Sequence, residues 1–249
     1  MTELESIRSL RARQLLLTHL PKDQLKSLEI EFGRYLLVPL DTPNFGSDAF
    51  TQWFFEHAAP IAQMSRDIAG PAAAPKVDSI DVQYDNLADK HSVTGKNFNE
   101  EFKDMFPHFK EQIEEFLPIA KLRHVKFWSS FNMVGLHRDS SAVFDCPLGF
   151  RSIMHDSNPA STLYIRESVP DKDLLERVYF PYGIGTTSYV WNNLRVKHGS
   201  DFVEGHRKIL MIVNRFDLDV ERYKQIMRAS VGKFGPFVTH SSFSAEDFR

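Results

Sequence analysis

The sequence of 249 residues contains a single cysteine, Cys146, so no disulfide can form within the chain. Disulfides are typical of secreted proteins, and a chain without them is more often found in a reducing, intracellular setting. Long apolar runs are also missing, since no segment approaches the roughly 20 residues that a membrane span needs. The charged residues 1–20 do not resemble a signal peptide. We therefore expect a soluble, cytoplasmic protein.

Other absences narrow the classes of function. The formal net charge is only -3 and no run of Lys and Arg stands out, so neither a nucleic acid nor a membrane is expected as a partner. The sequence has no Walker A motif. Residues 181–188, PYGIGTTS, lack a complete GxGxxG and a following helical pattern, which favours a turn between strands over a dinucleotide loop. The thiol of Cys146 lies beside a proline and is interpreted as incidental or buried rather than nucleophilic.

The first half of the chain has mixed character. Apolar periodicity and breaking residues predict helices at residues 3–17, 22–31, 47–58 and 107–116, with Ser47 as a cap, and a strand at 35–40. Residues 70–75 and 85–99 are rich in Pro, Ala, Gly or polar residues and are expected to form loops. Phe occurs 21 times, which indicates an aromatic core or pocket.

From Arg123 to Asp217 the chain consists of short runs rich in β-branched and aromatic residues, separated by Pro, Gly, Asn and Asp. About eight such runs suit an eight-stranded double-sheet jelly roll. We therefore predict a mainly β fold with flanking helices, in one domain spanning residues 1–249. Its parts are a helical or irregular N-terminal part (1–122), a jelly-roll core (123–217), and a C-terminal helix with a tail (218–249).

Three side chains within the strand-rich part could hold a metal. His137 and Asp139 are two residues apart, so on a strand they point to the same face, and His198 lies on a later strand. Two imidazoles and one carboxylate are the ligand set of non-haem Fe(II) sites, which leave positions open for other ligands. The alternative is that these are ordinary surface or core histidines, since the chain has 10.

Arg207 adds a fourth element to this pattern. It follows His198 across the turn at residues 203–206, so a hairpin would place it on the next strand. A guanidinium binds a carboxylate through two parallel hydrogen bonds, which suits recognition of a dicarboxylate. The alternative is a structural arginine.

The run HRD, followed by KHGSDFVEGHRKILMIV, resembles the Fe(II)/2-oxoglutarate-dependent dioxygenases, whose pattern is HxD, a distal His and then an Arg. The similarity covers residues 123–216. FRSIMHDSNPASTLYI and WNNLRVKHGSDF resemble segments of the aspartyl/asparaginyl β-hydroxylase-like and proline-hydroxylase-like branch, and PHFKEQIEEFLP resembles a helix before their first core strand. The resemblance implies a double-stranded β-helix of the jelly-roll, cupin-like type.

The resemblance also implies roles for individual residues. His137, Asp139 and His198 match the catalytic metal ligands, and Arg207 matches the residue that binds the 5-carboxylate of 2-oxoglutarate. Arg151 matches an arginine that assists cosubstrate binding. The implied cofactors are Fe(II), 2-oxoglutarate as cosubstrate, and O2.

The sequence departs from the family at two places. The branch has Arg-x-His where this chain has Ile153 in the third position and its nearest histidine at His155, and many members have Pro-Gly before HxD where this chain has Asn-Met-Val-Gly-Leu. Asp139 itself argues against a halogenase, which needs that position vacant for halide. Aromatic candidates for the pocket walls are Phe127, Trp128, Phe131, Tyr164 and Trp191. Polar candidates for orienting a substrate are Arg138, Asn132 and His155.

The expected activity is that of a non-haem iron dioxygenase: oxidation of an unactivated C–H bond of a small molecule, such as a free or modified amino acid, with release of succinate and CO2. One alternative is the same chemistry on a protein or peptide side chain. Another is a non-catalytic, cupin-like binding protein. The sequence leaves open the substrate, the choice among hydroxylation, desaturation and cyclisation, and the oligomeric state.

Overall fold

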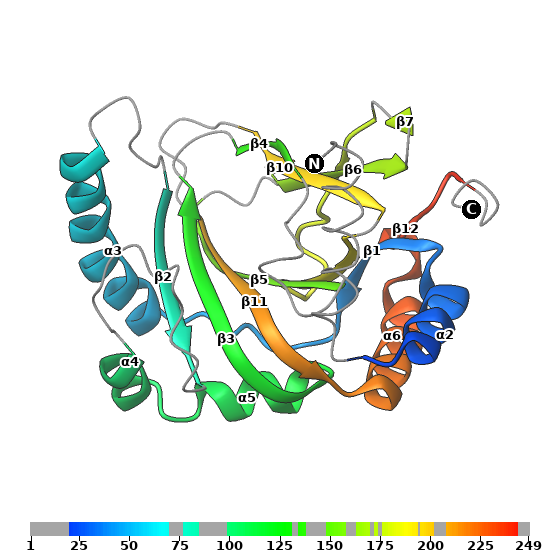
Figure 1. The fold of residues 1–249 in the computed structure, drawn as a ribbon, viewed down its shortest axis with the longest axis horizontal. Helices are drawn as coiled ribbons and strands as arrows, with labels where there is room; N and C mark the ends of the chain where they lie inside the picture. Colours follow the sequence, from blue (N-terminus) through cyan, green and yellow to red (C-terminus); the bar gives the residue numbers. More distant parts are fainter. Residues whose placement is uncertain are drawn as a thin grey trace, which may run out of the picture.

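The structure, a computed structural model, describes residues 20–69, 77–84, 99–130, 134–137, 148–157, 163–169, 172–173, 176–193, 195–201 and 208–243 (Figure 1). The described helices are α2 (Lys22–Phe32), α3 (Asp48–Ala69), α4 (Asn99–Met105), α5 (Phe109–Phe116), α6 (Val220–Phe234) and the 3-10 turn η1 (Gly235–Phe237).

The described strands form two antiparallel sheets. They are β1 (Tyr35–Leu40), β2 (Val77–Gln83), β3 (Ile119–Ser130), β4 (Val134–His137), β5 (Leu148–Asp156), β6 (Leu163–Val169), β7 (Lys172–Asp173), β8 (Val178–Tyr179), β9 (Ser188–Asn192), β10 (Val196–Ser200), β11 (Lys208–Leu218) and β12 (Thr239–His240). The large sheet has the order β12-β1-β9-β5-β11-β3-β2. The small sheet has the order β4-β10-β6-β7, with β8 also paired to β6.

The connection of these strands is that of a jelly roll. Strands β3, β5, β9 and β11 lie side by side in the large sheet, and β4, β6, β8 and β10 in the small one. The chain therefore passes repeatedly between the two sheets, which is how a double-sheet roll is wound. The predicted mainly β fold with a jelly-roll core and flanking helices is confirmed.

The large sheet has apolar side chains on both faces, and each face packs on a different layer. On one face Phe127 of β3 contacts Phe50 of α3, with ring centres 4.8 Å apart, within a cluster of buried residues that we call the helix-side core. On the other face Trp191 and Leu210 pack with Ile165 of the small sheet in a cluster that we call the inter-sheet core. Because side chains alternate along a strand, neighbouring residues of β9 and β11 serve the two cores in turn.

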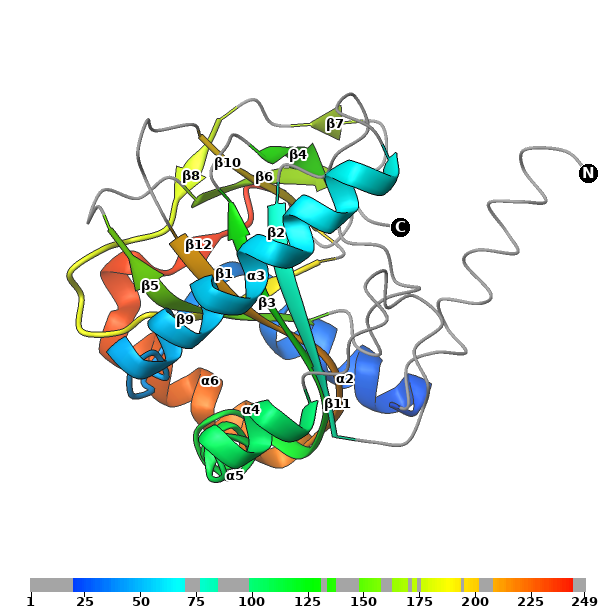
Figure 2. The ribbon, with the colours of Figure 1, turned by 90° about the vertical axis from the view of Figure 1, so that its left-hand side faces the viewer.

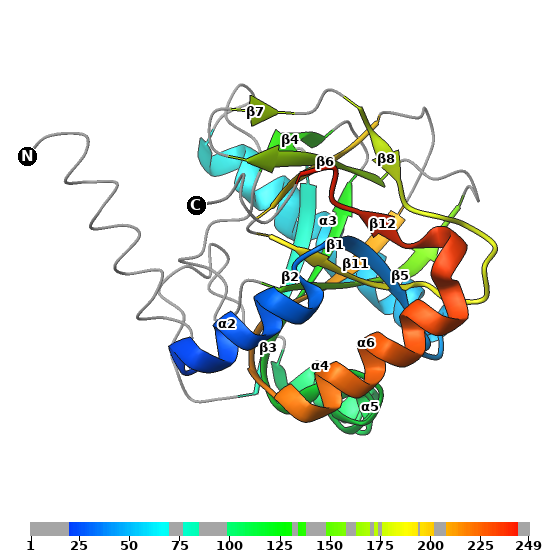
Figure 3. The ribbon, with the colours of Figure 1, turned by 90° about the vertical axis from the view of Figure 1, so that its right-hand side faces the viewer.

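The helices cover the large sheet rather than the small one. Figure 2 shows α3 crossing beside β2, and Figure 3 shows α2 and α6 running next to each other near β1. Strands β1, β2 and β12, from outside the roll, extend the large sheet at both edges. No helix in the described ranges is long and apolar enough to cross a membrane.

Several local predictions are confirmed in detail. The strand at 35–40 has the predicted bounds, and the helix predicted at 22–31 is α2. The hydroxyl of Ser47 accepts a hydrogen bond from the Phe50 amide at 3.1 Å, as expected of a helix cap, although α3 continues to Ala69 instead of ending at residue 58. The predicted helix 3–17 and the loop 70–75 lie outside the described residues, as does nearly all of the loop 85–99.

Candidate metal centre

His137 and His198 lie opposite each other on neighbouring antiparallel strands of the small sheet. His137 ends β4 and pairs in register with His198 of β10. Residues directly opposite in an antiparallel pair point to the same side, and Val196 and Ile165, which share that side, belong to the inter-sheet core. Both imidazoles therefore point toward the large sheet, into the space between the two sheets.

The separation of the two rings suits a shared ion. Their centres are 4.3 Å apart and their planes are inclined by 54°. Two imidazoles that bind one ion at right angles through metal–nitrogen bonds of about 2.1 Å have ring centres roughly 4.5 Å apart. His137 is exposed and His198 is half-buried, so the pair is accessible from solvent on the β4 side. The donor set and its spacing fit a metal such as Fe(II).

A third ligand has to come from elsewhere. Among the described residues no group of three or more His, Cys, Asp or Glu is arranged to hold a metal. Asp139, predicted as the carboxylate ligand, follows the end of β4 by two residues and lies outside the described residues. Four other predicted site residues also lie outside the described residues: Arg207, Arg138, Asn132 and Phe131.

Arg151 and Trp191 lie beside the histidine pair. Arg151 on β5 is buried, and its guanidinium carbon is 4.5 Å from the centre of the Trp191 ring. The centre of that ring is in turn 5.1 Å from that of His198. Trp128, half-buried, packs against the same inter-sheet core. Three residues predicted from the sequence are therefore on the face of the large sheet that the histidines address.

His155 requires a correction. Its ring packs on Phe55 of α3, with centres 6.1 Å apart, on the helix side of the large sheet. A bulge in β5 is the reason: Ile209 pairs with His155 but the next residue, Leu210, pairs with Ile153. The extra residue reverses the alternation, so His155 does not share the face of Arg151 and cannot orient a substrate at the histidine pair.

Two other predicted pocket walls also point away from the pair. Phe127 belongs to the helix-side core. Tyr164 neighbours Ile165 on β6 and faces the opposite side, where its ring meets Tyr179 at 5.8 Å and Arg177 at 4.5 Å. Both are core or surface packing residues, not walls of the metal centre.

The structure also places a buried polar group that sequence reasoning missed. Lys208 begins β11 on the same face as Leu210, and its ammonium is 3.8 Å from a carboxylate oxygen of Asp156. The Tyr182 hydroxyl donates a hydrogen bond to the same carboxylate. Burial lowers the pKa of Lys208 to about 8, against the opposing effect of Asp156. Burial, and then Asp156, raise the pKa of Tyr182.

Part of this group could have been found in the sequence. Lys208 directly precedes the apolar run 209–213 and stands two residues before Leu210, so alternation places its side chain on the same face as that of Leu210. Asp156 faces the same way only because of the β5 bulge. Tyr182 is placed by the loop before β9, in which Gly183 and Gly185 have φ of 71° and 85°, a region that side chains disfavour.

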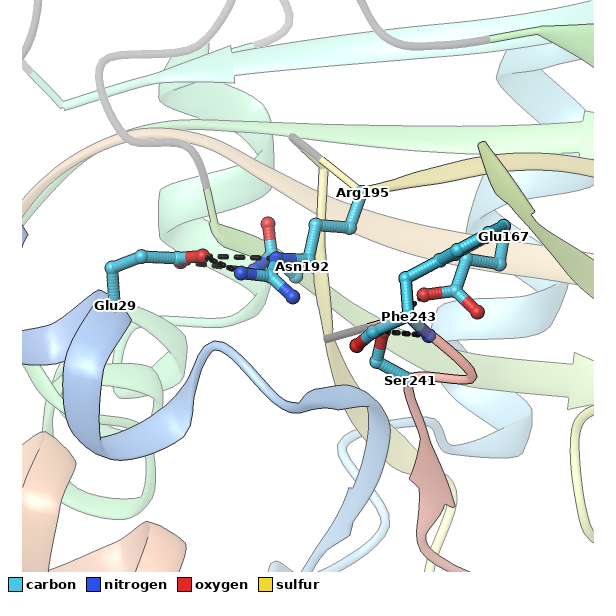
Figure 4. A network of polar contacts seen from close by, with 6 residues as sticks. All are labelled: Glu29, Glu167, Asn192, Arg195, Ser241 and Phe243. Atoms are coloured by element: carbon cyan, nitrogen blue, oxygen red, sulfur yellow. Dashed lines mark hydrogen bonds and ion pairs between the residues drawn. The ribbon is translucent and has the colours of Figure 1, made fainter. Parts of the chain in front are cut away.

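The turn that leads into β10 is held from outside the roll (Figure 4). Glu29 of α2 accepts hydrogen bonds from the guanidinium of Arg195, at 2.9 Å from Nε, and from the side-chain amide of Asn192 at 3.4 Å. On the neighbouring strand β6, Glu167 accepts from the amide of Ser242 at 2.8 Å. Arg195 is three residues before His198, so α2 helps to fix the strand that carries this histidine.

No family model and no curated protein matches the chain. Solved structures that match include a prolyl hydroxylase from Trichoplax adhaerens, in complex with a peptide fragment of the hypoxia inducible factor oxygen degradation domain. It is 8% identical with a TM-score of 0.40, covering 90% of this chain and 97% of that one. A prolyl-4-hydroxylase from Pseudomonas putida is 10% identical with a TM-score of 0.36, covering 77% and 98%.

A third match is HygX from Streptomyces hygroscopicus with nickel and 2-oxoglutarate bound. It is 12% identical with a TM-score of 0.37, covering 78% of this chain and 86% of that one.

Proposed function

We propose that the protein is an Fe(II)/2-oxoglutarate-dependent oxygenase that oxidises a C–H bond of a small molecule. The observation that carries this proposal is the pair His137 and His198, directly opposite on two strands of a jelly roll, with ring centres 4.3 Å apart. Asp139 completes the proposed ligand set. Three protein ligands leave positions open for a cosubstrate and dioxygen.

A bound Fe(II) would supply the oxidative decarboxylation of 2-oxoglutarate to succinate and CO2, coupled to oxidation of a substrate C–H bond. The chain's own residues bind and orient. His137 and His198 donate ring-nitrogen lone pairs to the ion, and Arg207 binds the distal carboxylate of 2-oxoglutarate. Arg151, buried beside the Trp191 ring, supplies a second positive charge facing the histidines, which suits the carboxylates of the cosubstrate.

The surroundings of the histidine pair favour a small substrate. Trp191 and Arg151 are 4% and 5% exposed, so the side chains opposite the pair are shielded from water. Reacting groups that are shielded from water and held by rigid neighbours suit a compact substrate bound in one orientation. We therefore propose a small-molecule substrate, such as a free or modified amino acid.

The proposal is tested by succinate release from 2-oxoglutarate in the presence of Fe(II) and O2. Replacing His137 by Ala should lower that rate by more than the roughly 10- to 100-fold loss typical of an outer-shell partner, because a ligand itself is removed. His155→Ala is the matched control, since this histidine lies on the helix side of the large sheet. Equal losses in both variants would contradict the assignment.

Metal and cosubstrate binding can be followed without turnover. Under anaerobic conditions, Fe(II) and 2-oxoglutarate together should produce a charge-transfer absorption band with the wild-type protein and none with Asp139→Ala. A wild-type protein that gives no band would exclude the proposed function.

A further inference from the structure

Trp191 links a buried cation to one of the proposed metal ligands. Its indole packs against the Arg151 guanidinium, whose carbon is 4.5 Å from the ring centre, and against the His198 imidazole at 5.1 Å. Trp191 comes from β9 of the large sheet and His198 from β10 of the small one. The indole therefore spans the space between the sheets at the point where the metal would bind.

The indole is itself fixed on several sides. Its Nε1 donates a hydrogen bond to the side-chain oxygen of Asn193 at 2.5 Å, and the Phe180 ring meets it at 5.7 Å in an edge-on arrangement. Gly149 of β5 lies directly beneath it: a Cβ at that position would be 2.8 Å from both Cε2 and Nε1. Glycine is thus needed at 149 for the indole to lie where it does.

We propose that Trp191 is a positioning residue for His198, which holds the imidazole in the orientation that metal binding requires. This inference rests on the proposed function, since it assigns a role toward the same ion. An imidazole binds a metal only when its ring plane contains the direction to the ion, so a rigid wall beside the ring raises affinity by removing other orientations. Trp191, a candidate for the pocket wall, thus acts through His198.

The position of the indole also gives a signal that shows whether the ion binds beside it. The chain has three tryptophans, and Trp191 is in direct ring contact with a proposed metal ligand. A paramagnetic ion held by His198 should quench its fluorescence. Trp53 of α3 is buried in the helix-side core and provides the matched control.

The experiment is an anaerobic titration of the metal-free protein with Co(II), followed by Co(II) absorption and by tryptophan fluorescence. In a Trp128→Phe background, which removes the other tryptophan packed on the inter-sheet core, the protein and its Trp53→Phe variant should lose fluorescence as the ion binds. Trp191→Phe in the same background should lose most of that response. Trp191→Leu should weaken Co(II) binding by roughly 10- to 100-fold, with Trp191→Phe closer to wild type because a ring remains. Gly149→Ala, which displaces the indole without changing any ligand, should weaken binding in the same direction.

The outcomes separate the two proposals. If wild-type protein binds no Co(II), the proposed function fails. If wild-type protein binds Co(II) but Trp191→Leu and Gly149→Ala bind it equally well, the positioning role is overturned. If those two variants do not fold, as judged by circular dichroism, Trp191→Phe in the Trp128→Phe background still decides. A full fluorescence response with Trp53 as the one remaining tryptophan would mean that the ion does not bind beside Trp191, and the positioning role would be overturned.

Discussion

Lys208 and Arg207 are adjacent cations, and at the scale of single residues they differ in how their charge depends on pH. Burial lowers the pKa of Lys208 to about 8, so its charge is present at neutral pH and is lost as the pH rises through that value. An arginine remains charged throughout. Binding of a carboxylate by Lys208 should therefore weaken above pH 8, whereas binding by Arg207 should not change with pH in this range.

We expect Arg207 to be the main contact to the distal carboxylate of 2-oxoglutarate. Arg207→Ala should raise the 2-oxoglutarate concentration needed for half-maximal succinate release by about 10- to 100-fold, the loss of a charge-assisted hydrogen-bonded pair, and leave Co(II) affinity unchanged. In the wild-type protein this requirement should stay nearly constant between pH 7 and pH 9. A rise of about 10-fold per pH unit above pH 8 would instead transfer the role to Lys208.

Those parts of the candidate site that depend on short sequence motifs were predictable, whereas those that depend on pairing between strands were not. His137 ends its strand as expected from HRD, and the later strand brings His198 opposite to it. The position of His155 was predicted wrongly because one bulge in β5 reverses the alternation that the sequence implies. The inward orientation of Asp156 was not predicted for the same reason. The pairing of β5 with β11 decides where the bulge lies, and the bulge turns Asp156 toward the inter-sheet core.

At the scale of elements, α2 acts on the site through the carboxylate of Glu29. Glu29 binds the guanidinium of Arg195, which is only 6% exposed, at the turn before β10. The same helix carries a second acidic residue, Glu31, whose partner Arg228 on α6 is 61% exposed in its side chain. The two pairs provide a comparison within one helix.

Glu29→Gln should lower the free energy of unfolding by about 1–3 kcal/mol, because a buried guanidinium loses its charged partner. Glu31→Gln should change it by no more than about 1 kcal/mol, as expected of an exposed ion pair. Urea unfolding at pH 7 measures both. If the two variants were equally stable, Glu29 would not be the contact that docks α2 on the turn.

Elements with strong local signals were predicted well. The strand at 35–40 is uniformly apolar, and α6 begins after Asp219, whose carboxylate accepts from the Arg222 amide at 3.0 Å. Strand β12 was not predicted. It is only two residues long, and its pairing with β1 arises from contacts between distant parts of the chain. The sequence also gave no indication that β1 and β2 join the sheet of the roll.

At the scale of the whole molecule, the two faces of the large sheet differ in the side chains that they carry. Its helix-side face is filled by aromatic residues from α3, α4 and β3, several of which meet edge to face, as Trp53 and Phe102 do at 5.1 Å. Its other face carries Arg151, Trp191 and Lys208. The helix-side face thus holds most of the aromatic packing, whereas the other face combines the inter-sheet core with these polar groups.

The strand that carries His137 has a consequence for dynamics. In the described part of the small sheet, β4 is an edge strand of four residues whose one neighbour is β10, and their pairing is irregular between His198 and Ser200. Such an edge opens locally at a lower free energy than the rest of the molecule. An ion bound by both histidines would link β4 to β10, so part of its binding free energy would stabilise the closed edge. Amide hydrogen exchange in β4 should therefore slow on addition of Co(II) while exchange in β3 is unchanged, and equal protection in both would show that the edge is already closed without the ion.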